Sequence, residues 1–177
     1  MGQKDKDVVN KIPIYKLKTT KEVMKYYDGW GDKYDQEMVD WNYTGPKETV
    51  NVFIKYTPNK KIRIYDAGCG TGWTVRRVAS HRLCHSATGV DGAEGMVEKA
   101  RSNDTVGKYF LADLLQWNPE KPVDVVHSME VFYYLAEPQV LIQHVSDNWL
   151  KKGGRLIIGV DFYTENRPSH SWATDCG

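Results

Sequence analysis

The chain has 177 residues, of which 41% are hydrophobic, and its 24 lysines and arginines nearly balance its 23 aspartates and glutamates. No apolar run approaches the about 18 residues that span a bilayer, and the even charge gives no support for binding to nucleic acid or to a membrane surface. Three cysteines without metal-ligand spacing, and an N-terminus without a signal-peptide core, favour free thiols and no metal site. We therefore expect one soluble, cytoplasmic domain.

The N-terminal third predicts an arm followed by helices. Residues 1–18 are polar and rich in lysine, which favours a flexible arm. Thr19 and Glu22 predict the start of a helix that carries aromatic side chains at helical spacing. Two more helices are expected, over residues 32–41 and after Gly45-Pro46. We expect residues 19–60 to form a helical cap contiguous with a core over residues 61–177.

From residue 61 onward, segments with strand and helix patterns alternate. The predicted strands cover residues 62–66, 87–91, 109–113, 123–128 and 155–160. The predicted helices cover residues 73–83, a segment around 96–100, and residues 141–149 followed by a cap at 151–154. Such alternation indicates an α/β fold with a doubly wound, mostly parallel sheet of about five strands, and with ligands at the C-terminal ends of the strands.

The first predicted strand runs into a turn with three glycines, Asp66-Ala67-Gly68-Cys69-Gly70-Thr71-Gly72-Trp73. Glycines permit positive φ and let a ligand approach the backbone closely. The lysine that a P-loop requires after its last glycine is missing. The spacing is G-x-G-x-G, not the G-x-G-x-x-G of dinucleotide sites, and the acid before the first glycine suits an ammonium group better than a pyrophosphate. The turn therefore predicts a ligand site for a group without phosphates.

Three predicted strands end at an aspartate: Asp66, Asp91 and Asp113. One such residue fits a helix cap or a turn equally well. Asp91 follows the last glycine by about 20 residues, where a carboxylate can accept the hydroxyls of a ribose. Three acids beside one glycine turn favour a ligand that needs several separate acceptors.

The glycine turn, the three aspartates at strand ends and the buried strand before Met129-Glu130 resemble the class I S-adenosylmethionine-dependent methyltransferases. The resemblance covers roughly residues 20–165. The resemblance implies a Rossmann-like fold with an N-terminal helical cap and methyl transfer from S-adenosylmethionine to a small-molecule acceptor, with S-adenosylhomocysteine as product. By position, it places Asp66 at the amino group of the cofactor, Asp91 at the ribose, and Asp113 with Leu114 at the adenine. Tyr27 or Tyr34 is expected at the methionyl carboxylate.

The same resemblance gives the wider set of expected cofactor contacts. This set is Tyr27, Tyr34, Asp66, Ala67, Gly68, Cys69, Gly70, Gly72, Trp73, Asp91, Gly92, Met96, Asp113, Leu114 and Ser128.

The segment after the fourth strand holds the candidates for catalysis, Glu130, His127 and Tyr133. Methyl transfer needs a base only if the acceptor carries a proton at its working pH, and Glu130 or His127 could then accept it. As alternatives, His127 is a hydrogen-bonded histidine at the end of a strand, and Glu130 is a carboxylate at the start of a helix.

Only residues 161–177 follow the fifth strand, whereas the family's sheet continues with two further strands. Either the chain is a truncated form, or a partner, which includes a second copy in a homodimer, covers the edge of the fifth strand. A non-catalytic protein that binds S-adenosylmethionine or S-adenosylhomocysteine is the alternative function.

Overall fold

The computed structural model describes residues 14, 17, 19–56 and 61–160. Most of the arm expected over residues 1–18 and the tail over residues 161–177 lie outside the described residues. No helix in the described ranges is long and apolar enough to cross a membrane. Within those same ranges, no group of three or more His, Cys, Asp or Glu side chains is placed to hold a metal ion.

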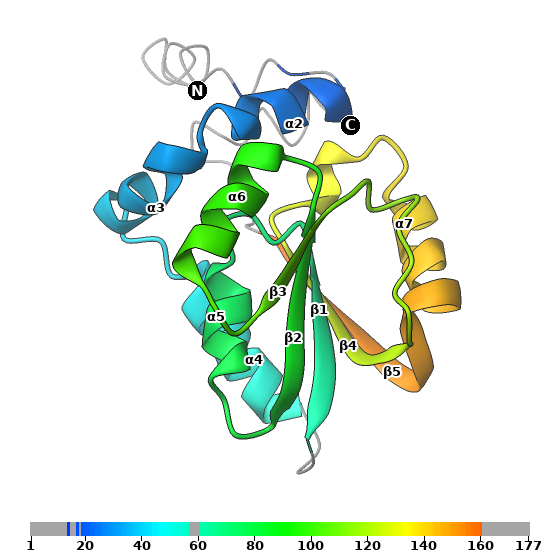
Figure 1. Cartoon of the computed structure of the whole chain (residues 1–177). Coiled ribbons are helices and arrows are strands. Elements are labelled where there is room, and N and C mark those ends of the chain that lie inside the picture. Colours follow the sequence, from blue (N-terminus) through cyan, green and yellow to red (C-terminus); the bar gives the residue numbers. More distant parts are fainter. Residues whose placement is uncertain (1–13, 15–16, 18, 57–60, 161–177) are drawn as a thin grey trace, which may run out of the picture.

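The centre of the molecule is a parallel sheet of five strands (Figure 1). The strands are β1 (Ile62–Ala67), β2 (Cys84–Asp91), β3 (Lys108–Leu111), β4 (Val123–Met129) and β5 (Leu150–Gly159). Their order is β3-β2-β1-β4-β5, and every neighbouring pair is parallel. The expected fold class is confirmed. The chain reverses its direction of winding between β1 and β4, which is where open α/β sheets bind ligands.

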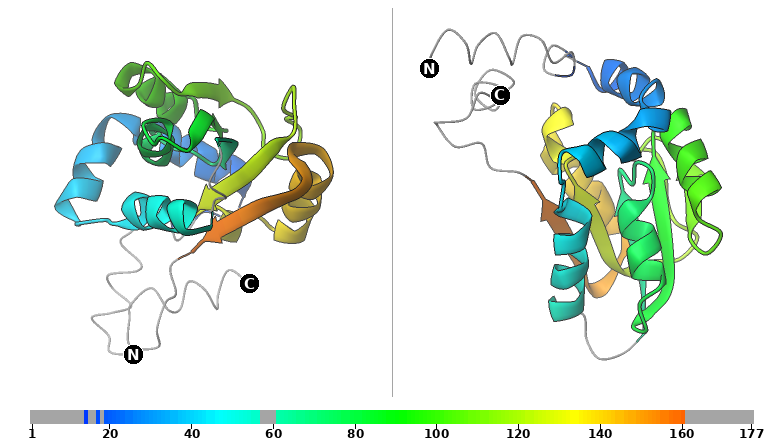
Figure 2. Two further views of the ribbon diagram at one scale, coloured as in Figure 1. Left: turned by 90° about the horizontal axis from the view of Figure 1, so that it is seen from below. Right: turned by 90° about the vertical axis from the view of Figure 1, so that its left-hand side faces the viewer.

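Helices cover both faces of the sheet (Figures 1 and 2). They are α2 (Thr20–Asp28), α3 (Gly31–Asp40), α4 (Gly45–Tyr56), α5 (Trp73–Ala79), α6 (Glu94–Asn103), the short η2 (Phe132–Tyr134), and α7 (Pro138–His144) with its π-type continuation η3 (Val145–Trp149). One apolar core joins α4, α5 and α6 to the sheet, through Phe53, Val78 and Val97. A second core on the other face joins α7 and η3 to β4, through Leu141 and Trp149.

The N-terminal helices divide between two places. Helices α2 and α3 lie beside α6 near the C-terminal ends of the strands, whereas α4 lies next to α5 and buries Phe53 in the core. The predicted start of α2 is confirmed, since Thr19 and Glu22 form a capping box. A Cβ on Gly31 would lie 2.7 Å from the carbonyl oxygen of Gly95, so glycine allows α3 to approach α6 closely.

Several predicted boundaries differ from the structure. The helix expected over residues 73–83 ends at Ala79, because the chain must turn before Leu83, whose carbonyl accepts the backbone N–H of Ile62. The third strand ends at Leu111, two residues before Asp113. The cap expected at residues 151–154 is instead part of β5, which contains an irregular register and a positive φ of 76° at Gly153.

Candidate functional site

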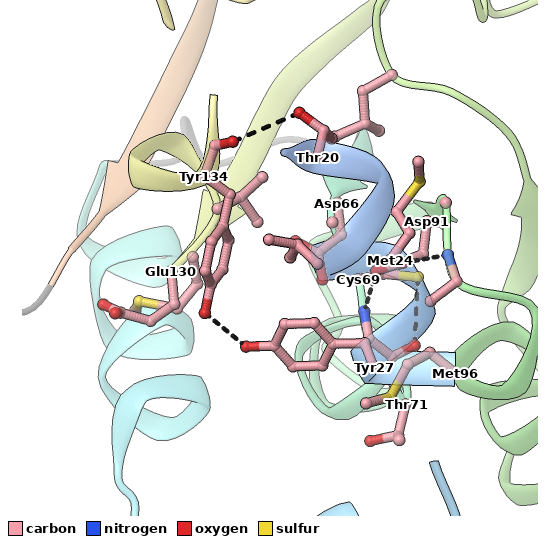
Figure 3. A pocket seen from close by; sticks show the side chains of 18 of the residues that line it. Thr20, Met24, Tyr27, Asp66, Cys69, Thr71, Asp91, Met96, Glu130 and Tyr134 are labelled. Carbon is pink, nitrogen blue, oxygen red and sulfur yellow. Dashed lines mark hydrogen bonds between the residues drawn. The ribbon is translucent and has the colours of Figure 1, made fainter. Parts of the chain in front are cut away.

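A cavity of about 410 Å³ opens at the point where the sheet reverses its winding (Figure 3). The turn after β1 and the segment after β4 form its floor and one side, while the ends of β2 and β3 form the other side. Helices α2 and α3 contribute residues that include Met24, Tyr27 and Tyr34. The cavity is therefore bounded by strand ends on the sheet side and by the N-terminal helices on the other.

The glycine turn forms the part of the wall nearest β1. Gly68 and Gly72 have φ values of 77° and 81°, a left-handed conformation that side chains rarely adopt. A Cβ on Gly68 would overlap Cγ2 of Val131, whereas a Cβ on Gly70 would have no atom within 4 Å. The backbone N–H groups of Gly68 and Cys69 donate to the carbonyl of Val90, at 2.8 and 3.2 Å, and hold the turn against β2. The turn thus exposes backbone atoms to the cavity without side chains that would cover them.

All three strand-end aspartates line the cavity, and each is held differently. Asp66 is 4% exposed and its Oδ1 lies 2.6 Å from Nδ1 of His127. The carboxylate of Asp91 accepts the backbone N–H groups of Gly70 and Ala93, at 2.8 and 2.9 Å.

The Asp113 side chain is exposed and accepts the backbone N–H of Leu115 at 2.9 Å. Burial raises the pKa of Asp91 above its ordinary value, although the two backbone N–H groups that it accepts act in the opposite direction. The site thus presents one buried carboxylate paired with a histidine, one partly buried carboxylate held by backbone N–H groups, and one at the surface.

Asp35 on α3 ties the N-terminal helices to the glycine turn. Its carboxylate accepts hydrogen bonds from the Thr71 hydroxyl, from Trp73 Nε1 at 2.7 Å, and from Asn103 Nδ2 at 3.0 Å. Arg76 Nη2 lies 3.9 Å away. Three donors on separate elements converge on this one side chain, so α3, the turn and α6 are held in register.

Tyrosines form the wall opposite the turn. The hydroxyls of Tyr27 on α2 and Tyr134 on η2 lie 2.8 Å apart, and the ring centroids of Tyr27 and Tyr34 are 6.3 Å apart (Figure 3). Burial, with the neighbouring Tyr134 phenol, raises the pKa of Tyr27 above its ordinary value. Burial has the same effect on Tyr34. These phenols therefore stay protonated and neutral around neutral pH.

Glu130 begins the segment that follows β4. It has a φ of 56°, which is uncommon for any residue other than glycine, and its backbone N–H donates to the carbonyl of Gly159 at 2.9 Å. Tyr133 donates its hydroxyl to Glu130 Oε2 at 2.8 Å. Burial, together with the phenol of Tyr134 and the carboxylate of Glu130, raises the pKa of Tyr133, which keeps this donor protonated.

The structure brings most of the expected site residues together. Those that line the cavity are Tyr27, Tyr34, Asp66, Gly68, Cys69, Gly70, Trp73, Asp91, Gly92, Met96, Asp113, Leu114 and Glu130. Those that do not line it are Ala67, Gly72, His127, Ser128 and Tyr133. His127 lies behind Asp66, and the buried Ser128 hydroxyl donates to the carbonyl of Ala67 at 2.7 Å. Gly72 caps α5, and a Cβ there would meet the Tyr109 hydroxyl at 2.6 Å.

Sequence reasoning missed several cavity residues. Met24 is the clearest case: it lies one helical turn before Tyr27 and Asp28, so the face of α2 that it shares with Tyr27 was a usable signal. Thr71 and Thr74 are part of or next to the glycine turn. Val131 lies in the segment that holds the candidates for catalysis, but no spacing in the sequence predicts its contact with Gly68.

The donors and acceptors of the cavity suit the expected cofactor. Its charged lining consists of the carboxylates of Asp66, Asp91, Asp113 and Glu130, with Lys21 as the only basic side chain among the described lining residues. Carboxylates accept from ammonium and hydroxyl groups, whereas a phosphate would need basic groups or a helix N-terminus without an acid beside it. The open space at Gly70 leaves room for a ligand against the backbone.

Comparisons with known proteins agree with this chemistry. Residues 65–158 match a family model described as a methyltransferase domain. Trans-aconitate 2-methyltransferase of Rhizobium rhizogenes is 33% identical over 109 residues, which are 61% of this chain and 41% of that protein. The chain thus spans about two fifths of the length of this curated relative.

Two solved structures extend the comparison. The chain is similar to a structure described as a complex between the Haloferax volcanii Trm112 methyltransferase activator and the putative methyltransferase. The TM-score is 0.68 at 28% identity, and the match covers 84% of this chain and 66% of that chain. A DhpI–SAH complex has a TM-score of 0.62 at 20% identity, with 76% and 65% of the two chains covered, and shares the fold.

Proposed function

Because the chain belongs to the class I S-adenosylmethionine-dependent methyltransferases, we propose that it transfers a methyl group from S-adenosylmethionine to a small-molecule acceptor. One observation carries the proposal: the glycine turn, Asp66, Asp91 and Asp113 line a single cavity at the point where the sheet reverses its winding. The trans-aconitate named for the Rhizobium relative supports a small acceptor. The size of the cavity, about 410 Å³, agrees with this.

Each polar group of the cavity has a role in this proposal. Asp66 accepts the ammonium group of the methionyl part, Asp91 accepts the ribose hydroxyls, and Asp113 with Leu114 contacts the adenine. Tyr27 or Tyr34 donates to the methionyl carboxylate, for which their high pKa values keep the hydroxyl protons available. The turn from Gly68 to Gly72 supplies close backbone contact, and Cys69, Trp73, Gly92 and Met96 complete the wall.

When bound, S-adenosylmethionine supplies an electrophilic methyl group on a sulfonium. The task of the chain is to hold the acceptor in line with that group and to exclude water, which accounts for most of the acceleration in such displacements. The tyrosine wall and the apolar side chains of Met24, Leu114 and Val131 exclude water from the cavity. No residue needs to act as a nucleophile.

Among the three candidates for catalysis, Glu130 lies in the cavity wall and is the one that an acceptor would meet. Tyr133 donates to Glu130 and orients its carboxylate. His127 is buried behind Asp66, and we assign it the role of orienting that carboxylate instead of the role of a base.

We also propose that a partner covers the edge of β5, which among the described residues pairs only with β4. The candidates are a second copy of the chain and an activator protein of the kind named in the Haloferax volcanii complex. A cytoplasmic location and the lack of nucleic-acid binding stay predictions from composition.

A transfer assay tests the function. The chain is incubated with S-adenosylmethionine that carries a labelled methyl group and with a panel of small acceptors, and products are identified by mass spectrometry. Labelled product from the wild-type chain, and its loss in Asp91→Ala, are the expected results. Binding of S-adenosylhomocysteine without any labelled product would instead favour the non-catalytic alternative.

A further inference from the structure

The acceptor side of the cavity combines a carboxylate with aromatic rings. Three of the four lining carboxylates have roles toward the cofactor in the proposed function, which leaves Glu130 for the acceptor. Beside it, Tyr134 reaches across to Tyr27, with 2.8 Å between the hydroxyls and 5.9 Å between the ring centroids. In Figure 3, Glu130 lies next to Tyr134, whose hydroxyl meets the hydroxyl of Tyr27.

Two hydrogen bonds hold Glu130 in place. Its backbone is locked by the hydrogen bond from Glu130 N–H to the Gly159 carbonyl, and its Oε2 accepts the Tyr133 hydroxyl. An ionised carboxylate is a stronger acceptor for the Tyr133 hydroxyl than a neutral carboxyl group would be. The left-handed φ of 56° at Glu130 is a conformation that a glycine or asparagine would adopt more easily. A glutamate kept in such a conformation favours a functional side chain at this position.

The tyrosines around Glu130 also favour the binding of a positively charged group. Aromatic faces carry partial negative charge and attract cations, and the effect grows when water is excluded. Tyr27, Tyr34 and Tyr134 all line the cavity, and each is partly buried. Rings and carboxylate together stabilise a positive charge on an acceptor atom.

A carboxylic acid acceptor would meet the opposite situation. A carboxylate binds best to a cationic partner, and the only basic side chain among the described lining residues is Lys21, which is exposed on α2. The carboxylate that has no role toward the cofactor, Glu130, would repel it. The acceptor named for the Rhizobium relative, trans-aconitate, is a tricarboxylate and does not suit this lining.

We propose that the acceptor is an amine, and that Glu130 with Tyr27 and Tyr134 stabilises the positive charge that its nitrogen gains. This inference rests on the proposed function. The lone pair of the neutral amine forms a bond to the methyl carbon, the carbon–sulfur bond breaks, and its electron pair stays on sulfur. The sulfonium becomes a neutral thioether, the nitrogen becomes a positively charged methylammonium, and any proton it then loses passes to solvent. In this proposal the carboxylate of Glu130, which lies in the cavity wall, stabilises the charge that develops on the nitrogen.

Binding of matched probes tests the class of acceptor without turnover. The chain is first saturated with S-adenosylhomocysteine, whose binding is measured by calorimetry. It is then titrated with phenethylamine, with 3-phenylpropanoate, which has the same apolar body and the opposite charge, and with trans-aconitate. We expect phenethylamine to bind at least about tenfold more tightly than either acid, since one charge-assisted hydrogen bond is worth that much.

Two variants assign the preference to Glu130. Glu130→Gln keeps an acceptor for Tyr133 but removes the charge, and should lose most of the preference while S-adenosylhomocysteine affinity is unchanged. Glu137→Gln makes the same change at an exposed position outside the cavity wall and should keep the preference.

Equal or tighter binding of the acids, no binding of phenethylamine in the millimolar range, or a preference that survives Glu130→Gln would overturn the inference while the proposed function stands. The comparison of probes on the wild-type chain holds even if a variant fails to fold. Failure of S-adenosylhomocysteine itself to bind would instead overturn the proposed function, and the inference with it.

Discussion

Asp66 and His127, 61 residues apart in the chain, form a buried pair at the centre of the sheet, with Oδ1 and Nδ1 2.6 Å apart. The two residues are register partners on the neighbouring strands β1 and β4. Nε2 of His127 has no hydrogen-bond partner among the described residues. A histidine so enclosed has one contact of consequence, which is the carboxylate that lines the cavity.

Replacement of His127 should therefore weaken cofactor binding. His127→Leu keeps the volume but leaves a buried carboxylate without its donor, and we expect it to lower the free energy of unfolding by about 1–3 kcal/mol. His127→Asn, which keeps an N–H donor, should lose less. Calorimetry with S-adenosylhomocysteine and steady-state kinetics distinguish a residue that positions Asp66 from a residue that acts as a catalytic base. A catalytic base would lower kcat and leave cofactor affinity unchanged, and that result would contradict the positioning role.

The glycine turn offers a matched pair of substitutions. Gly68→Ala forces a Cβ into Cγ2 of Val131 at a φ of 77°, whereas Gly70→Ala places its Cβ in open space at a φ of 50°. Both pay about 1–2 kcal/mol for the left-handed backbone, and Gly68→Ala loses about 1–3 kcal/mol more through the overlap. Denaturant unfolding measures the difference. Equal losses of stability for the two variants would show that the contact with Val131 does not constrain the turn.

Asp35 should control how the N-terminal helices meet the site. Asp35→Ala removes the shared acceptor of Thr71, Trp73 and Asn103, so we expect weaker binding of S-adenosylhomocysteine and faster proteolysis within residues 19–56. Asp32→Ala is the control, because its exposed carboxylate only approaches Lys99 at 3.8 Å and should change stability by less than about 0.5 kcal/mol. Equal protease sensitivity of the two variants would exclude the role of Asp35.

Acid should weaken cofactor binding through Asp91. Burial raises the pKa of this carboxyl, so the folded chain holds its proton up to a higher pH than the unfolded chain does. Its contribution to stability is therefore complete below the ordinary aspartate pKa and is lost as the pH rises through the raised value. Affinity follows the opposite course, because only the carboxylate accepts strongly from the ribose.

A pH series of S-adenosylhomocysteine titrations checks the effect of Asp91. Affinity should fall as the pH is lowered through the raised pKa. Asp91→Asn should flatten that profile, and Asp147→Asn, at an exposed position, should keep it. A wild-type profile that Asp91→Asn leaves intact would assign the titration to another group.

Local sequence patterns predicted the order of elements because the strands and helices of this core carry their own signals. The β-branched Ile62 and Ile64 of β1, and the valines at 123, 125 and 126 of β4, are buried in the two strands between which the sheet reverses its winding. The capping box at Thr19 also depends only on neighbours within one turn.

The predicted start and end residues of elements were wrong where pairing with a neighbouring strand overrides the local sequence pattern. Strand β2 begins at Cys84, three residues before the expected start, because Cys84 pairs with Ile62. Residues 151–154 have the composition of a helix cap but form part of β5, since β5 must return to β4 after an irregular register.

The candidate site was predicted to the extent that its residues follow strand ends. The positions of Asp66, Asp91 and Asp113 around one cavity follow from a parallel sheet, in which all C-terminal ends meet at one edge. Pairs such as Asp35 with Thr71 and Tyr27 with Tyr134 depend on how the N-terminal helices dock, and no spacing in the sequence encodes that.

Titration of the chain with S-adenosylhomocysteine by calorimetry tests whether the cavity at the point where the sheet reverses its winding is the cofactor site. We predict binding to one site per chain, with a loss of about 1–3 kcal/mol of binding free energy in Asp91→Ala through the unpaired ribose hydroxyls. NADH under the same conditions should give no binding heat. Absence of binding at high micromolar S-adenosylhomocysteine, or an affinity that Asp91→Ala leaves unchanged, would show that this cavity is not the cofactor site.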